Sequence, residues 1–156
     1  MTLEYGKSLP KHKREEGKYP VVGSNGIDGY HSKYMLEGPN IIVGRKGSVG
    51  KVNFITENCT PIDTCFYVKV NSDIINFNYC YRLLLSLNLE TLNTGLGPGG
   101  LNRNTAYNLN INIPLIEEQK KIVAQIEEIE KQISEAQAII DSSKQKKQEI
   151  LDKYLK

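Results

Sequence analysis

The segment with the most obvious chemical potential is GRKGSVGK, residues 44–51. A phosphate-binding loop requires the pattern Gly-x4-Gly-Lys-Ser/Thr between a strand and a helix. Here the first glycine lies one position too far upstream, Val52 replaces the metal-binding hydroxyl, and the residues that follow are typical of a strand. We therefore expect a glycine-hinged hairpin whose tip presents Arg45, Lys46 and Ser48 to DNA phosphates or base edges. A plain solvated turn is the alternative.

The remaining reactive side chains are scattered and predict neither a catalytic constellation nor a metal site. His12 and His31 are isolated, and the cysteines (Cys59, Cys65 and Cys80) lack the spacing of zinc ligands. An odd number of cysteines and the absence of an apolar secretion signal favour a reducing cytoplasm. No run of about 18 apolar residues occurs, so no membrane-spanning helix is expected. We expect no catalytic residue, no metal and no cofactor in this chain.

Positive charge is concentrated in the first third of the chain, although the formal net charge is only +2. Residues 1–51 contain nine Lys or Arg against five Asp or Glu, and the rest of the chain is slightly acidic. A local basic face fits an anionic partner such as DNA, and a solvated basic surface is the alternative. The candidate phosphate contacts are Lys13, Arg14, Arg45, Lys46 and Arg103, and the candidate base readers are Ser24, Asn25, His31 and Tyr34.

The first part of the chain predicts an α+β domain with a small mixed or antiparallel sheet. It is rich in glycine, asparagine and short apolar runs, which are typical of short strands joined by turns. The glycine-rich loop at 93–104 contains GLGPGG, whose free N–H groups either approach a phosphate or belong to a mobile connection. The expected strands are 19–22, 40–43, 49–55, 65–70 and 109–113, with turns at 23–26 and 28–29 and a helix at 77–92 capped by Asn76.

Residues 115–156 contain no glycine or proline and predict one long helix with a coiled-coil seam. Apolar residues recur at alternating spacings of three and four, which is the heptad pattern. Such a strip needs a partner helix, and at about 1.5 Å per residue the helix is too long to pack entirely on its own domain. We therefore expect a boundary at Pro114, a domain at 1–113, a coiled-coil helix at 114–156, and an interface formed by Ile122, Ile126, Ile129, Ile133, Ile140 and Ile150.

The charges on this helix favour antiparallel pairing of two copies. Residues 115–135 carry six Glu and three Lys, whereas residues 136–156 carry three acidic residues and five Lys. An antiparallel pair places each half beside its complement, whereas a parallel pair opposes like charges. Compensation of the helix macrodipole is the alternative explanation of the gradient.

Four stretches in order resemble the type I restriction–modification specificity subunits. KYPVVGSNGIDGYHSKYMLEGPNIIVGRKGSVGKV (18–52) is similar to two landmarks of their target-recognition domains, a Pro-x-x-Gly-Ser-Asn-Gly turn and a Gly-Arg-Lys-Gly-Ser-x-Gly hairpin. GLGPGGLN (95–102) and INIPLIEEQKKIVAQIE (111–127) resemble two more, the second being the start of the spacer helix. Each stretch alone is weakly specific, but the four together cover nearly the whole chain.

This resemblance implies a sequence-specific DNA-binding subunit that is not an enzyme. It would direct a methyltransferase subunit, which uses S-adenosylmethionine, and a restriction subunit to a bipartite target in double-stranded DNA. Family members contain two such units, but this chain contains one, so a homodimer or pairing with another specificity subunit is expected. The chain also starts inside the usual first segment, so we expect the customary N-terminal strand to be absent. A coiled-coil assembly adaptor without DNA readout is the alternative function.

Overall fold

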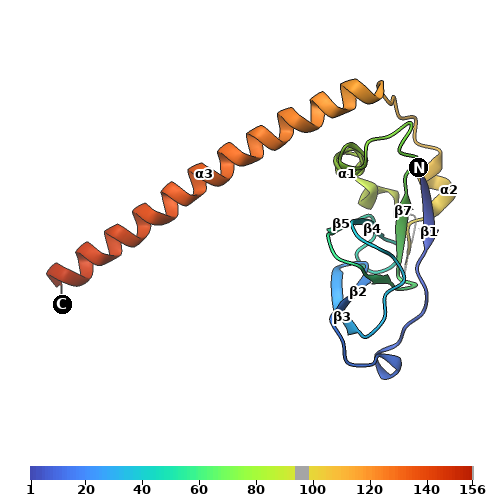
Figure 1. Ribbon diagram of the computed structural model, residues 1–156, viewed down its shortest axis with the longest axis horizontal. Coiled ribbons are helices and arrows are strands. Elements are labelled where there is room, and N and C mark those ends of the chain that lie inside the picture. Colours follow the sequence, from blue (N-terminus) through green and yellow to red (C-terminus); the bar gives the residue numbers. More distant parts are fainter. Residues whose placement is uncertain (94–98, 156) are drawn as a thin grey trace. The chain divides into compact units, whose positions relative to one another are not determined.

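The computed structural model describes residues 1–93 and 99–155 and confirms the α+β fold class. Contacts divide the chain into two compact units, Met1–Ile116 and Glu117–Lys156. Unit 1 holds all the strands and short helices, and the described part of unit 2 belongs to one helix, α3 (Ile116–Leu155), drawn in orange and red in Figure 1. Within the described ranges, no helix combines the length and the apolar character needed to cross a membrane.

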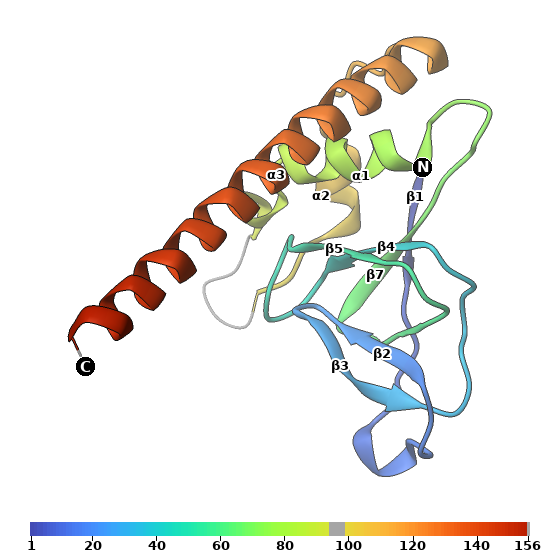
Figure 2. The same ribbon diagram turned by 60° about the vertical axis from the view of Figure 1, so that its left-hand side comes forward.

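Unit 1 is built on two sheets, whose strands are β1 (Thr2–Tyr5), β2 (Tyr19–Gly23), β3 (Gly26–His31), β4 (Asn40–Gly44), β5 (Val52–Ile55), β6 (Thr60–Pro61) and β7 (Cys65–Lys69). The first sheet has the order β1-β7-β4-β5 and is antiparallel throughout. The second has the order β3-β2-β6, in which β2 and β6 run parallel. Figure 2 shows the β2–β3 hairpin below β4, β5 and β7.

One cluster of buried residues joins the two sheets. It contains Val22 from β2, Ile42 from β4, Ile55 from β5 and Cys65 from β7, all buried. The Cys65 thiol donates to the carbonyl oxygen of Val22 across the sheets at 3.3 Å. Burial raises the pKa of Cys65 to about 12, and burial likewise raises the pKa of Cys59 to about 11. These thiols therefore stay protonated and serve as packing residues.

The described residues of unit 1 also form four short helices: η1 (Lys11–Lys13), α1 (Phe77–Ser86), η2 (Leu89–Leu92) and α2 (Arg103–Tyr107). Asn76 is the N-cap of α1, as predicted, because its side chain accepts a hydrogen bond from the N–H of Tyr79 at 3.0 Å. The helix predicted for 77–92 is nevertheless interrupted. Asn88 has a φ of +46°, a left-handed conformation that ends one helical segment before the next begins.

The prediction of a strand at 109–113 is wrong. These residues follow α2 as an irregular segment. Leu109 and Ile111 line an apolar pocket of unit 1 together with Leu3 and Leu84. The alternating apolar pattern therefore places Leu109 and Ile111 at an apolar pocket beside α1 and β1, and residues 109–113 pair with no strand among the described residues.

β1, which is not among the strands expected from the sequence, pairs with β7 over four residues, from Thr2↔Lys69 to Tyr5↔Phe66. The expected absence of the family's customary N-terminal strand stays a prediction. The predicted second turn at 28–29 is instead a bulge within β3. Val21 pairs with Gly29 and Val22 with Ile27, so Asp28 is left between two ladder positions. The predicted strand 49–55 begins only at Val52.

Candidate nucleic-acid interface

A polar pocket of about 470 Å³ on unit 1 collects three of the predicted phosphate contacts. Arg45 and Lys46 reach it from the loop after β4, and Arg103, the first residue of α2, also lines it. Tyr5 of β1, Asn102 and Asn104 also line it, together with the chain at Gly99–Leu101. The pocket therefore gathers residues from both ends of unit 1 around a concentration of positive charge.

The backbone around Arg45 and Lys46 is held from three directions. The N–H groups of both residues donate to the carbonyl oxygen of Thr64, at 2.9 and 3.0 Å. The carbonyl oxygen of Arg45 accepts from the N–H of Leu101 at 2.8 Å, and the hydroxyl of the buried Ser24 donates to the carbonyl oxygen of Lys46. The two side chains therefore project from a fixed backbone, and Ser24 helps to position that backbone.

The loop that carries these residues closes as a glycine-hinged hairpin, as predicted. β4 and β5 are antiparallel partners in register from Asn40↔Ile55 to Val43↔Val52. Gly47 and Gly50 have φ values of +75° and +76°, a conformation that side chains rarely adopt. The loop is followed by strand β5, whereas a phosphate-binding loop is followed by the helix whose N-terminus holds the phosphate.

The two guanidinium groups of the pocket lie over one aromatic ring. The Cζ atom of Arg45 is 5.0 Å from the centroid of Tyr5, and that of Arg103 is 5.2 Å from it. Within residues 1–93 and 99–155, no ion pair joins Arg45, Lys46 or Arg103 to a carboxylate. Planar guanidinium forks with unused donors match the oxygens of an anion such as phosphate. Sequence reasoning missed Tyr5, because nothing local marks a strand residue as the neighbour of Arg103.

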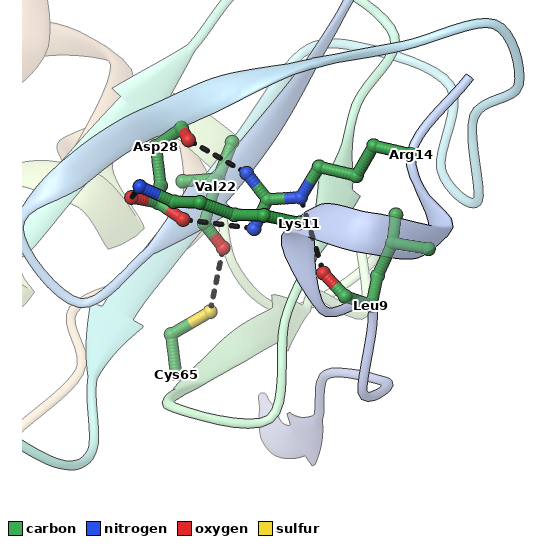
Figure 3. Close-up of polar contacts among 6 residues, drawn as sticks. All are labelled: Leu9, Lys11, Arg14, Val22, Asp28 and Cys65. Carbon is green, nitrogen blue, oxygen red and sulfur yellow. Dashed lines mark hydrogen bonds and ion pairs between the residues drawn. The ribbon is translucent and has the colours of Figure 1, made fainter.

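Arg14 lies apart from this pocket and makes intramolecular bonds (Figure 3). Its guanidinium donates to the carbonyl oxygen of Leu9 at 3.1 Å, the carbonyl oxygen of Asp28 at 2.7 Å and the Asp28 carboxylate at 2.8 Å. Only 10% of its side chain is exposed. The bulge in β3 directs Asp28 toward these bonds, so Arg14 ties the segment around η1 to the β2–β3 hairpin.

We predict that this contact makes stability depend on pH. The hydrogen bond from Arg14, with help from the charge of Lys11, holds the pKa of Asp28 below its ordinary value of 3.8. A lowered folded-state pKa contributes stability that is present above the ordinary pKa and lost as the pH falls through the folded value. Asp28→Asn should therefore melt below wild type at pH 7, and thermal melts should converge below about pH 4. Asp73→Asn, an exposed carboxylate in another loop, is the control, and a constant Asp28→Asn deficit down to pH 2 contradicts the prediction.

The other predicted DNA contacts occupy separate places on unit 1. His31 accepts a hydrogen bond from the N–H of Glu15 at 3.0 Å, and it lines a shallow pocket with Tyr34. Asn25, at the β2–β3 turn, accepts from the ammonium of Lys51 at 2.7 Å. Their contacts with DNA stay predictions, as do those of the exposed Lys13 in η1 and the half-buried Ser48. The predicted phosphate approach of the 95–100 loop falls largely on 94–98, outside the described residues.

The predicted interface residues on α3 leave an apolar stripe uncovered. Ile129, Ile133, Ile140 and Ile150 are 56%, 63%, 49% and 59% exposed, and Ile122 and Ile126 are half-buried. Isoleucines at this spacing in an otherwise charged helix are typical of a seam that another helix covers. In the described part of the chain, no group of three or more His, Cys, Asp or Glu is placed to hold a metal ion.

Comparison with known proteins gives concordant matches. Residues 1–151 match the family model described as the type I restriction modification DNA specificity domain. The chain is 27% identical over 130 residues to the type I restriction enzyme EcoprrI specificity subunit of Escherichia coli. This match covers 80% of this chain and 32% of that protein. It therefore spans about a third of the length of this curated relative.

Solved structures agree on the fold. The S subunit of the type I restriction–modification system of M. genitalium is 21% identical with a TM-score of 0.67, over 89% of this chain and 39% of that one. A second chain comes from a structure of the type I R-M system that describes its complex assembly and conformational transition. It is 20% identical with a TM-score of 0.72, and the match covers 97% of this chain and 42% of that one. The HsdS subunit of Thermoanaerobacter tengcongensis is 19% identical with a TM-score of 0.62, and the match covers 85% of this chain and 35% of that one.

Proposed function

Since the chain belongs to the family of type I restriction–modification DNA specificity domains, we propose that it is a non-catalytic DNA-binding specificity subunit. In this proposal unit 1 reads one half of a bipartite target in double-stranded DNA. A separate methyltransferase subunit transfers the methyl group from S-adenosylmethionine, and a restriction subunit cleaves the DNA. The complex acts in the cytoplasm. The purified chain alone then neither methylates nor cuts DNA.

The observation that carries the proposal is the pocket formed by Tyr5, Arg45, Lys46 and Arg103. Its cations form no ion pair in the described parts of the chain, and the backbone of Arg45 and Lys46 is fixed by hydrogen bonds from distant segments. Phosphate contacts of this kind fix the register of a protein on duplex DNA, while neighbouring polar groups read bases. The turns that carry Asn25, His31 and Tyr34 are candidates for that reading.

We predict that removing the cationic hairpin tip weakens DNA binding for every sequence. The double substitution Arg45→Ala, Lys46→Ala removes two positive charges, so the slope of log K against log salt should flatten by about two units. The measurement is a titration of duplex DNA at several salt concentrations. Lys69→Ala, an exposed lysine at the far end of β7, is the matched control. An unchanged slope for the double variant places the hairpin outside the interface.

An assembly adaptor is the second candidate function, because the exposed isoleucine stripe of α3 favours a partner helix. An adaptor has no need of the cationic pocket, so DNA binding distinguishes the two functions. Methylome sequencing of cells with and without the gene is the most informative experiment. Loss of one methylation motif supports the specificity subunit and reveals its target. An unchanged methylome together with an absence of DNA binding leaves the adaptor.

The stripe further supports association of two copies through antiparallel α3 helices. The acidic first half and the basic second half of the helix become neighbours in that arrangement. At about 1.5 Å per residue the 40-residue helix is about 60 Å long, enough to separate two recognition units by a turn or two of duplex. Two identical units would read an interrupted palindrome. Pairing with a different specificity subunit would instead produce an asymmetric methylation motif.

A further inference from the structure

The ring of Tyr5 brings together two positive charges that are far apart in the sequence. Arg45 and Arg103 both lie over this ring, within 5.2 Å of its centroid. Their charges are therefore no more than about 10 Å apart, which is close to the Debye length at ordinary ionic strength. The two guanidiniums repel each other, and the negative face of the ring offsets part of that repulsion.

Tyr5 is 49% exposed, and its ring packs against one aromatic neighbour in the sheet. Tyr5 pairs with Phe66 in the β1–β7 ladder, and their ring centroids are 4.9 Å apart. Each guanidinium is also anchored once to the backbone: Arg45 donates to the carbonyl oxygen of Asp63 at 3.2 Å, and Arg103 to that of Leu3 at 3.3 Å. Long side chains normally lose rotamer freedom on binding, and these two have already lost much of it.

An anion is the ligand that completes this arrangement. A guanidinium has five N–H donors, and the described contacts of Arg45 and Arg103 each use one of them. The remaining donors belong to a pocket that also contains Lys46, Asn102 and Asn104. A bound phosphate would neutralise the repulsion between the guanidiniums and accept from both planar forks.

We propose that Tyr5 is a positioning residue whose ring holds Arg45 and Arg103 as a preorganised clamp for one phosphate group. The inference rests on the proposed function for the identity of that group, which is then a backbone phosphate of the bound duplex. The clamp contributes affinity and register for all DNA sequences and does not alter the preferred bases.

The test compares Tyr5→Leu with Tyr5→Phe. Leucine keeps an apolar contact with Phe66 but removes the ring, whereas phenylalanine keeps the ring. Tyr5→Leu should weaken binding of a duplex of mixed sequence by roughly tenfold, because two cation–π contacts are lost. It should also reduce the salt slope by about one unit, although no charge is removed. Tyr5→Phe should bind as wild type does. Sequencing of duplexes selected from a random pool should return the same motif for both variants.

A second variant covers the case in which Tyr5→Leu does not fold. Arg103→Lys retains the charge but loses the planar fork and its stacking, so binding should weaken several-fold. Arg103→Lys with wild-type affinity overturns the clamp even where Tyr5→Leu does not fold. Where Tyr5→Leu does fold, the double variant Tyr5→Leu, Arg103→Lys should lose little more than either single variant, because both changes disable the same clamp. Additive losses, or a Tyr5→Leu variant with normal affinity and normal salt slope, overturn the clamp. A changed sequence motif in Tyr5→Leu also overturns it, because it indicates base reading.

Inorganic pyrophosphate separates this inference from the proposed function. The probe should raise the melting temperature of wild type and Tyr5→Phe, and raise that of Tyr5→Leu much less. If wild type fails to bind DNA but pyrophosphate stabilises it through Tyr5, the anion clamp stands and the proposed function fails. If wild type binds DNA and Tyr5→Leu is indistinguishable from it with both ligands, the proposed function stands and the clamp fails.

Discussion

Replacing Gly50 with alanine is expected to lower the free energy of unfolding of unit 1 by more than about 3 kcal/mol. Two costs combine at this position. The φ of +76° is strained for any residue with a Cβ atom, which costs about 1–2 kcal/mol. A Cβ atom would also overlap the backbone of Leu89 and Glu90 in η2, which cannot move away as a flexible side chain can.

Gly47 is the matched control for this substitution. It lies in the same loop with a φ of +75°, but the nearest atom to an added Cβ is the Ser24 hydroxyl oxygen at 3.7 Å. Gly47→Ala should therefore show only the backbone strain, about 1–2 kcal/mol. Denaturant unfolding followed by the near-ultraviolet circular dichroism of the tyrosines measures both. Equal losses for the two variants would show that η2 does not pack against the loop as the structure has it.

The second large effect concerns the isoleucine stripe of α3. Ile133→Asp, Ile140→Asp should convert a dimer at micromolar concentration into a monomer, weakening association by more than about a hundredfold. Each isoleucine buried in a seam contributes about 1.5–3 kcal/mol, and about 1.4 kcal/mol corresponds to a tenfold change in Kd. The substituted carboxylates would in addition be buried without partners. Light scattering and sedimentation equilibrium measure the mass directly.

The double variant Ala138→Asp, Gln145→Asp is the control for the effect of added negative charge by itself. Both positions lie on the face of α3 opposite the seam in the heptad register, so the same charge is added away from the isoleucines. This variant should remain a dimer. A wild-type chain that is monomeric at micromolar concentration contradicts the homodimer before any variant is made. A dimer that persists in Ile133→Asp, Ile140→Asp places the interface elsewhere.

The sequence by itself determined the elements whose pattern is local. The heptad spacing predicted one helix almost to its ends, because a 3.6-residue period over 40 residues has no competing interpretation. The glycines at 47 and 50 predicted the β4–β5 hairpin, since their φ requirements are a property of the loop itself. Asn76 identified the start of α1 through hydrogen bonding within three residues.

Only the tertiary structure decided which residues meet. β1 is four residues long and exists because β7 pairs with it, so its sequence carries little signal. The alternating residues 109–113 look like a strand, but they pair with no strand in the described part of the chain, and Leu109 and Ile111 line an apolar pocket of unit 1. Residue type made Arg14 and Arg45 equal candidates for DNA contact. In the folded chain the Arg14 guanidinium donates hydrogen bonds to Asp28, whereas Arg45 lies beside Tyr5 and Arg103. Tyr5 and Arg103 are 98 residues apart in sequence, and the conformational preferences of short segments do not predict contacts at that separation.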